Sequence, residues 1–201
     1  MLNKTTKRKH HQKHINFIYY RHSYNKMIRR PIITVLGHVD HGKTTLLDKI
    51  RTTVVAKGEA GGITQSIGCS AVPMKVVEKI CGKLMQNLKS KSTIPGLLFI
   101  DSPGHAAFTS LRKRGGSLAD IAILVVDINE GFKPQTVESL EILRANKVPF
   151  VVAANKIDLI GGWQYDPEKF WLENFAALPY EVQGELEKKT YELVGKLSEF
   201  G

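Results

Sequence analysis

The stretch Gly37-His38-Val39-Asp40-His41-Gly42-Lys43-Thr44 fits the phosphate-loop pattern G-x-x-x-x-G-K-[ST], and this pattern is the strongest indication of how the chain folds. Residues 32–36 before it predict a short buried strand, and residues 45–50 after it predict the start of a helix. A loop between strand and helix points successive backbone N–H groups inward, with the positive end of the helix dipole behind them. The alternative is a chance glycine-rich turn, which the flanking strand and helix disfavour.

The residues of this loop have separate expected roles. Gly37 and Gly42 allow close approach to phosphates and φ values that a Cβ would resist. Lys43 would neutralise the β- and γ-phosphates, and the Thr44 hydroxyl would bind Mg²⁺. The predicted phosphate-binding residues are Gly37, Asp40, His41, Gly42, Lys43, Thr44, Thr45 and, from a later motif, Gly104.

Length and composition indicate one ordinary globular domain with a tail: 201 residues, 42% hydrophobic and 24% charged. No apolar run approaches the ~18 residues of a transmembrane helix, so no membrane partner is expected. Cys69 and Cys81 lack CxxC spacing and nearby histidine clusters. They are typical of free thiols in a reducing compartment, and neither a disulfide nor a zinc site is expected.

The formal charge of +10 belongs to the N-terminal tail. Residues 1–30 hold nine of the 29 basic residues and no acid, which leaves 20 bases against 19 acids in the remainder. Residues 1–27 are therefore a basic extension, and residues 28–201 are the domain. The extension is interpreted as disordered or not natural, ahead of an arm that contacts RNA phosphates and ahead of a transit peptide.

Apolar runs at 97–100, 121–126 and 148–154 alternate with helical patterns at 76–88 and 137–145. This alternation predicts an α/β fold, with a mostly parallel sheet covered by helices on both faces. Gly37, Asp101 and Asn155 follow predicted strands, at the sheet edge where such folds bind ligands.

Other segments carry weaker patterns. Residues 71–74 predict a strand placed at a sheet edge by Pro73, and residues 59–65 predict a loop. Residues 165–175 are rich in aromatic side chains and predict irregular structure. Residues 182–200 predict an amphipathic packing helix, with an apolar face that includes Val194 and with i,i+4 charge pairs Glu185/Lys189 and Glu192/Lys196.

Two further motifs supply nucleotide chemistry. In Asp101-Ser102-Pro103-Gly104-His105, Asp101 could hold Mg²⁺ through water, and the Gly104 N–H could bond a γ-phosphate. In Asn155-Lys156-Ile157-Asp158, the Asp158 carboxylate could accept hydrogen bonds from guanine N1–H and N2–H₂, whereas adenine offers no donor there. Asn155 and the stem of Lys156 would brace the purine.

Together these motifs resemble those of the GTPases of protein synthesis. The similarity is greatest to the G domain of the translation initiation factor two/five B family in its archaeal-type form, and it covers roughly residues 28–201. Stretches that carry it include 59–65, 95–101, 111–116, 127–131 and 133–136, with Gly162-Trp163. The resemblance implies a phosphate-loop GTPase fold and a G domain that is incomplete at its C-terminus.

The resemblance also implies roles for individual residues. His105 would be the catalytic residue that orients water, and Val39 with Ile63 would form an apolar gate around it. Thr64 would be the switch threonine and would bind Mg²⁺ beside Thr44 and Asp101. Asp40 would help to hold a monovalent cation near the phosphates.

The partners implied are GTP and GDP, the ribosome as activator in the cytoplasm, and initiator tRNA through domains absent from this chain. The expected function is GTP binding and hydrolysis in ribosomal subunit joining and initiator tRNA placement. Three alternatives stay open: another translational GTPase, a nucleotide-binding fragment that does not hydrolyse GTP, and an RNA-binding module that works through residues 1–30.

Overall fold

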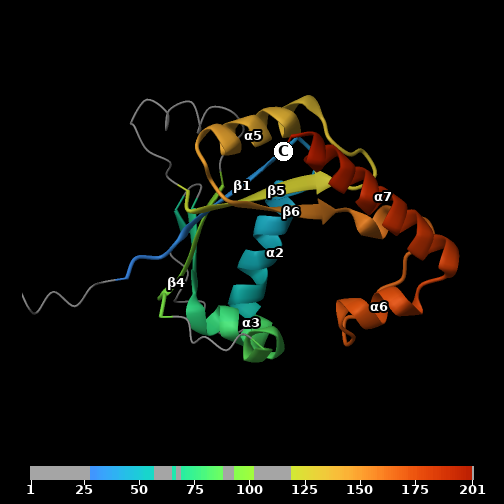
Figure 1. The fold of residues 1–201 in the computed structure, drawn as a ribbon. Coiled ribbons are helices and arrows are strands. Elements are labelled where there is room, and N and C mark those ends of the chain that lie inside the picture. The colour runs from blue at the N-terminus through green and yellow to red at the C-terminus, as the bar shows by residue number, and fades with distance from the viewer. Residues whose placement is uncertain (1–27, 57–64, 67–68, 88–92, 102–118, 201) are drawn as a thin grey trace, which may run out of the picture.

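The computed structural model describes residues 28–56, 65–66, 69–87, 93–101 and 119–200. One six-stranded sheet runs through them in the order β2-β3-β4-β1-β5-β6 (Figure 1). Its strands are β1 (Ile32–Gly37), β2 (Gln65–Ser66), β3 (Cys69–Pro73), β4 (Gly96–Asp101), β5 (Ile121–Asp127) and β6 (Phe150–Asn155).

The centre of the sheet is parallel. Strand β1 pairs in parallel with β4 on one side and β5 on the other, and β6 pairs in parallel with β5. Strand β3 joins β4 in the antiparallel direction and carries β2 on its outer side. The predicted mostly parallel sheet is therefore confirmed. Strand β2 pairs with Cys69 and Ser70 of β3. On that side of β3, Pro73 therefore has no partner strand among the described residues, which suits a residue that has no backbone N–H to donate.

Helices cover both faces of this sheet (Figure 1). The helices on these faces are α2 (Lys43–Ala56), α3 (Met74–Asn87), α5 (Pro134–Ala145) and α7 (Tyr180–Glu199). A 3₁₀ turn η1 (Ile157–Leu159) and the short helix α6 (Trp171–Ala177) lie between β6 and α7 in the chain. Helices α2 and α3 contribute Leu47 and Val76 to one core cluster, whereas α5 and α7 contribute Leu140 and Leu186 to the other.

Alternation along the strands divides the two cores. In β5, Leu124 and Val126 belong to the cluster with α5 and α7, whereas Val125 belongs to the cluster with α2 and α3. Strand β1 does the same with Leu36 on one side and Val35 on the other. Successive side chains of a strand point to opposite faces, so a fully apolar run is the pattern that a two-sided core requires.

Three local expectations were wrong. Residues 165–175 are not irregular throughout, because α6 begins at Trp171, which stacks on Phe175 one turn later with ring centroids 6.2 Å apart. Val194 is exposed rather than on the buried face of α7. Lys196 pairs with Glu199 at 3.0 Å instead of Glu192, while the predicted Glu185–Lys189 pair is present at 3.7 Å.

Other expectations concern the termini, the loops and the cysteines. The extension 1–27 lies outside the described residues, as does most of the 59–65 loop, whose last residue, Gln65, begins β2. Cys69 and Cys81 are both free and partly buried, as expected. Among the described helices, none combines the length and the apolar character needed to cross a membrane.

Candidate functional site

Four strand ends meet at one edge of the sheet. Gly37 ends β1, Asp101 ends β4, Asp127 ends β5 and Asn155 ends β6. The registers place them side by side, since Asp101 pairs with Val35, Gly37 pairs with Val125, and Asp127 pairs with Asn155. The predicted meeting of Gly37, Asp101 and Asn155 at one edge is thus confirmed. Asp127 joins them there.

The phosphate loop has the backbone that its glycines were expected to allow. Gly37 has φ +141° and Gly42 has φ +93°. A Cβ at Gly37 would lie 2.2 Å from the Val125 carbonyl oxygen, and one at Gly42 would lie 2.2 Å from Asn155 Nδ2. Both positions therefore exclude a side chain on grounds of space and conformation. Asp40 is exposed and also left-handed, at φ 62°.

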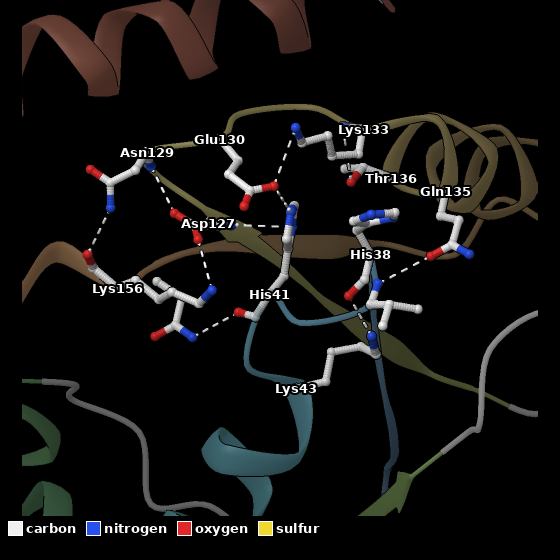
Figure 2. Close-up of polar contacts among 12 residues, drawn as sticks. His38, His41, Lys43, Asp127, Asn129, Glu130, Lys133, Gln135, Thr136 and Lys156 are labelled. Atoms are coloured by element: carbon white, nitrogen blue, oxygen red, sulfur yellow. Dashed lines mark hydrogen bonds and ion pairs between the residues drawn. The ribbon is translucent and has the colours of Figure 1, made fainter. Parts of the chain in front are cut away.

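The loop leads directly into the first turn of α2. Lys43 begins this helix, and its Nζ donates to the His38 carbonyl oxygen at 2.6 Å, so the ammonium group lies back across the loop (Figure 2). Thr44 and Thr45 are exposed in the same turn. A cationic side chain, exposed hydroxyls and a helix N-terminus together form a surface suited to an anion.

The predicted base-binding residues lie against this loop. Asn155 Nδ2 donates to the His41 carbonyl oxygen at 2.8 Å, which joins the end of β6 to the phosphate loop. Lys156 follows in the left-handed conformation, at φ 61° and ψ 33°. Asp158 is exposed within η1, so its carboxylate is accessible to a ligand.

The His41 side chain is buried against β5, with only 1% of the residue exposed. Its Nδ1 accepts a hydrogen bond from the Asp127 N–H at 3.2 Å (Figure 2), so in this arrangement the proton of a neutral ring resides on Nε2. Burial lowers the pKa of His41 below its ordinary value, and His38 lowers it further. Nε2 has no hydrogen-bond partner within the described part of the chain and lies 3.7 Å from Glu130 Oε2.

Asp127 and Asn129 were missed in the sequence as site residues. Asp127 Oδ2 lies 2.9 Å from Lys156 Nζ, and Asp127 Oδ1 accepts from the Asn129 N–H at 2.8 Å. Asn129 Nδ2 donates to the Lys156 carbonyl oxygen at 3.0 Å (Figure 2). Burial alone would raise the pKa of Asp127, but the hydrogen bonds from Lys156 and Asn129 hold that pKa below its usual value. The available signal was position: Asp127 ends an apolar run just as Asp101 does.

The other side of the phosphate loop contacts the start of α5. The Val39 N–H donates to Gln135 Oε1 at 3.1 Å, while the Val39 side chain is exposed. Glu130 pairs with Lys133 at 3.2 Å close by. Loop, strand ends and α5 therefore form one hydrogen-bonded rim.

Several predicted residues cannot be placed relative to this rim. Ile63, Thr64, Gly104 and His105 lie outside the described residues. Of Asp101, the structure gives the backbone position beside β1. Thr44, exposed in the first turn of α2, would offer a hydroxyl oxygen, which is a ligand that suits Mg²⁺.

Comparison with known proteins decides the family. Residues 28–196 match the family model of the elongation factor Tu GTP binding domain. The chain belongs to this family. It is a GTP-binding domain with a phosphate-loop GTPase fold, as its motifs predicted.

Among individual relatives, initiation factors recur. The chain is 63% identical over 177 residues to a probable translation initiation factor IF-2 of Methanopyrus kandleri, and 61% identical over 176 residues to one of Thermococcus onnurineus. Each match covers 88% of this chain and 30% of the relative. A crystal structure of GDP-bound aIF5B from Aeropyrum pernix superposes with a TM-score of 0.78 at 59% identity, and the match covers 87% of this chain and 29% of that one. The chain thus spans less than a third of the length of these relatives. These matches favour the initiation-factor interpretation over another translational GTPase.

Proposed function

We propose that this chain is the GTP-binding and GTP-hydrolysing part of a translation initiation factor. The observation that carries the proposal is the 2.8 Å hydrogen bond from Asn155 Nδ2 to the His41 carbonyl oxygen. This bond holds the loop of residues 155–158, here called the base-reading loop, against the phosphate loop of residues 37–44. One ligand with a purine and a phosphate chain can therefore contact both loops. The initiation-factor relatives support the biological setting.

In the proposed reaction, water attacks the γ-phosphate of GTP in line with the leaving GDP. The loop N–H groups, the first turn of α2 and Lys43 would bind the phosphates and stabilise their developing charge. Mg²⁺, held through Thr44, Thr64 and Asp101, would neutralise charge on the β- and γ-phosphates. His105 would orient the water, and Val39 with Ile63 would restrict its access until the ribosome binds.

The partners belong to the same proposal. We propose GTP and GDP as ligands, the ribosome as activator in the cytoplasm, and initiator tRNA as a partner of regions beyond this domain in the longer relatives. A monovalent cation near Asp40 would add positive charge beside the phosphates. Asp40 is exposed in the loop, which leaves its carboxylate accessible for this role.

The test is base selectivity. Asp158→Asn should shift the preference from GTP toward XTP, because xanthine O2 is an acceptor that suits an amide donor, while Asp158 itself needs the two donors of guanine. Affinities of both proteins for GTP, XTP and ATP, measured by calorimetry, check this. Lys43→Ala is the companion variant and should abolish nucleotide binding, because Lys43 would contact the phosphates. Wild-type protein that binds ATP as tightly as GTP would contradict the assignment.

Hydrolysis is tested separately, by single-turnover reactions with and without ribosomes. His105→Ala should retain GTP binding and lose the ribosome-dependent rate, because His105 would act only on the attacking water. Wild-type protein that binds GTP but never cleaves it would instead favour the non-hydrolysing alternative.

A further inference from the structure

The last residue of β5 carries a buried carboxylate that faces the base-reading loop. The side chain of Asp127 is 4% exposed and that of its partner Lys156 is 29% exposed, with 2.9 Å between Oδ2 and Nζ. A charge pair this protected from water is screened far less than one at the surface. Separating the pair would leave a carboxylate without its counterion at a place where water cannot solvate it.

Asn129 completes the connection between the two strand ends. Its N–H donates to Asp127 Oδ1 at 2.8 Å, and its Nδ2 donates to the Lys156 carbonyl oxygen at 3.0 Å. The Ile128 N–H donates to the Asn155 carbonyl oxygen at 3.0 Å and extends the ladder between β5 and β6 by one bond. The side chain of Lys156 is therefore held by the last residue of β5, and its backbone by the loop that follows.

This support acts on a residue whose backbone conformation is unfavourable. Lys156 has φ 61°, a conformation uncommon in residues other than glycine, and it lies between Asn155 and the turn that carries Asp158. Such a conformation persists when surrounding contacts over-determine it. Here the contacts are the ion pair with Asp127 and the hydrogen bond from the Asn129 side-chain amide to the Lys156 carbonyl oxygen (Figure 2).

We propose that Asp127 is a positioning residue for base recognition, which acts through Lys156 and is assisted by Asn129. By fixing Lys156, it sets the direction in which the chain leaves β6 and so the place of the Asp158 carboxylate relative to the phosphate loop. This proposal rests on the guanine-binding function proposed above. It adds the loop after β5 to the base site, although no residue of that loop needs to touch the base.

The experiment uses GDP and IDP, whose bases differ by the exocyclic amino group that Asp158 would bind. Asp127→Asn should weaken GDP binding by about 10- to 100-fold, the range expected for loss of a charge-assisted hydrogen bond. It should also lower the preference for GDP over IDP, because a displaced Asp158 gains less from the amino group. A merely structural role would weaken both nucleotides equally and leave that preference unchanged.

A double-mutant cycle tests the route through Lys156. The variant Lys156→Ala should already lack the effect of Asp127 if Asp127 acts through Lys156. Adding Asp127→Asn to Lys156→Ala should therefore lower the GDP affinity by less than about a further twofold. Effects that multiply in the double variant would overturn the proposal. Asp120→Asn is the matched control: it removes a carboxylate at the other end of β5, and it should leave the affinities for GDP and IDP unchanged.

Three further cases separate the positioning role from the guanine-binding function on which it rests. If Asp127→Asn does not fold, Asn129→Ala decides, since it removes the bond from Nδ2 to the Lys156 carbonyl oxygen and keeps both partners of the Asp127–Lys156 ion pair. This variant should lower the preference for GDP over IDP, and an unchanged preference would overturn the proposal. If the wild-type protein binds ADP as tightly as GDP, the guanine-binding function itself is wrong. Normal GDP selectivity in wild type with an unchanged preference in Asp127→Asn would overturn the positioning role alone.

Discussion

Strand β5 has a carboxylate–cation pair at each end, and the two pairs differ in what surrounds them. At the amino end, Asp120 accepts from Arg29 Nη1 at 2.6 Å and from the Ile32 N–H at 2.8 Å. At the carboxyl end, Asp127 accepts from Lys156 at 2.9 Å and from the Asn129 N–H at 2.8 Å. The chemistry is therefore the same, one cationic side chain and one backbone donor for each carboxylate.

Burial and neighbours separate these two ends. Arg29 and Asp120 are 67% and 34% exposed, and their pair fastens the start of β1 to the start of β5. Lys156 and Asp127 are 29% and 4% exposed, and their pair joins two loops at the ligand edge. In a parallel sheet the carboxyl ends of all strands meet at one edge, so only one end of β5 can contribute to a ligand site. The place of an ion pair in the sheet thus determines whether it supports the fold or the function.

Of the changes that test this contrast, Gly42→Ala should cause the largest loss of GDP affinity. Gly42 lies in the phosphate loop, at the edge of the sheet where the parallel strands end. A Cβ there would lie 2.2 Å from Asn155 Nδ2, and φ +93° resists any side chain, so the bond between phosphate loop and base loop should break. We expect GDP affinity to fall by at least about 100-fold, which corresponds to roughly 3 kcal/mol. Titration with a fluorescent guanine nucleotide measures it.

Gly184→Ala is the control for this substitution. Gly184 lies in α7, where a Cβ would meet nothing within 4 Å, so the change should preserve binding and favour the helix. Equal GDP affinity in Gly42→Ala and wild type would show that the two loops do not depend on this close contact.

His41, in the same phosphate loop, should make a smaller contribution to folding stability, and this contribution should depend on pH. Because burial lowers the pKa of His41 below its ordinary 6.5, the unfolded chain takes up a proton more readily than the folded one. The contribution of His41 to stability is therefore present above pH 6.5 and declines as pH falls from there toward the lower folded pKa. Denaturant unfolding across this range should show the decline in wild type and a smaller one in His41→Asn. Identical pH profiles for the two proteins would contradict this role for His41.

The sequence predicted the shared features of the ligand edge better than its internal links. Gly37, Asp101 and Asn155 were found because each follows an apolar run, and strand ends in a parallel sheet share an edge. The Asp127–Lys156 pair depends instead on two side chains that are 29 residues apart in the chain and meet only when β5 and β6 align. Helix α6 was missed because its seven residues are too few to show a helical period, although Glu173 accepts from the Phe170 N–H at 3.0 Å as a local signal of the helix start.

The smallest effect is expected at the amino end, in Arg29→Ala. The guanidinium group is exposed, so screening by solvent and salt should limit the loss to a slight fall in Tm, and GDP affinity should not change. Asp120 keeps its bond from the Ile32 N–H in this variant, and the strand start stays attached. The hydrogen bond from Arg29, with that from Ile32, holds the pKa of Asp120 below its ordinary 3.8. Stability from this carboxylate is therefore present above pH 3.8 and is lost as pH falls through the lower folded pKa.

The Tm difference between wild type and Arg29→Ala should accordingly be seen at neutral pH and low salt, shrink as salt is added, and vanish once Asp120 is protonated. Thermal melts over pH and salt, each paired with a GDP titration at neutral pH, measure both halves of the expectation. A large drop in GDP affinity in Arg29→Ala would mean that the amino end of β5 is coupled to the ligand edge through the length of the strand. The contrast between the two ends would then be one of distance from the ligand and not of function.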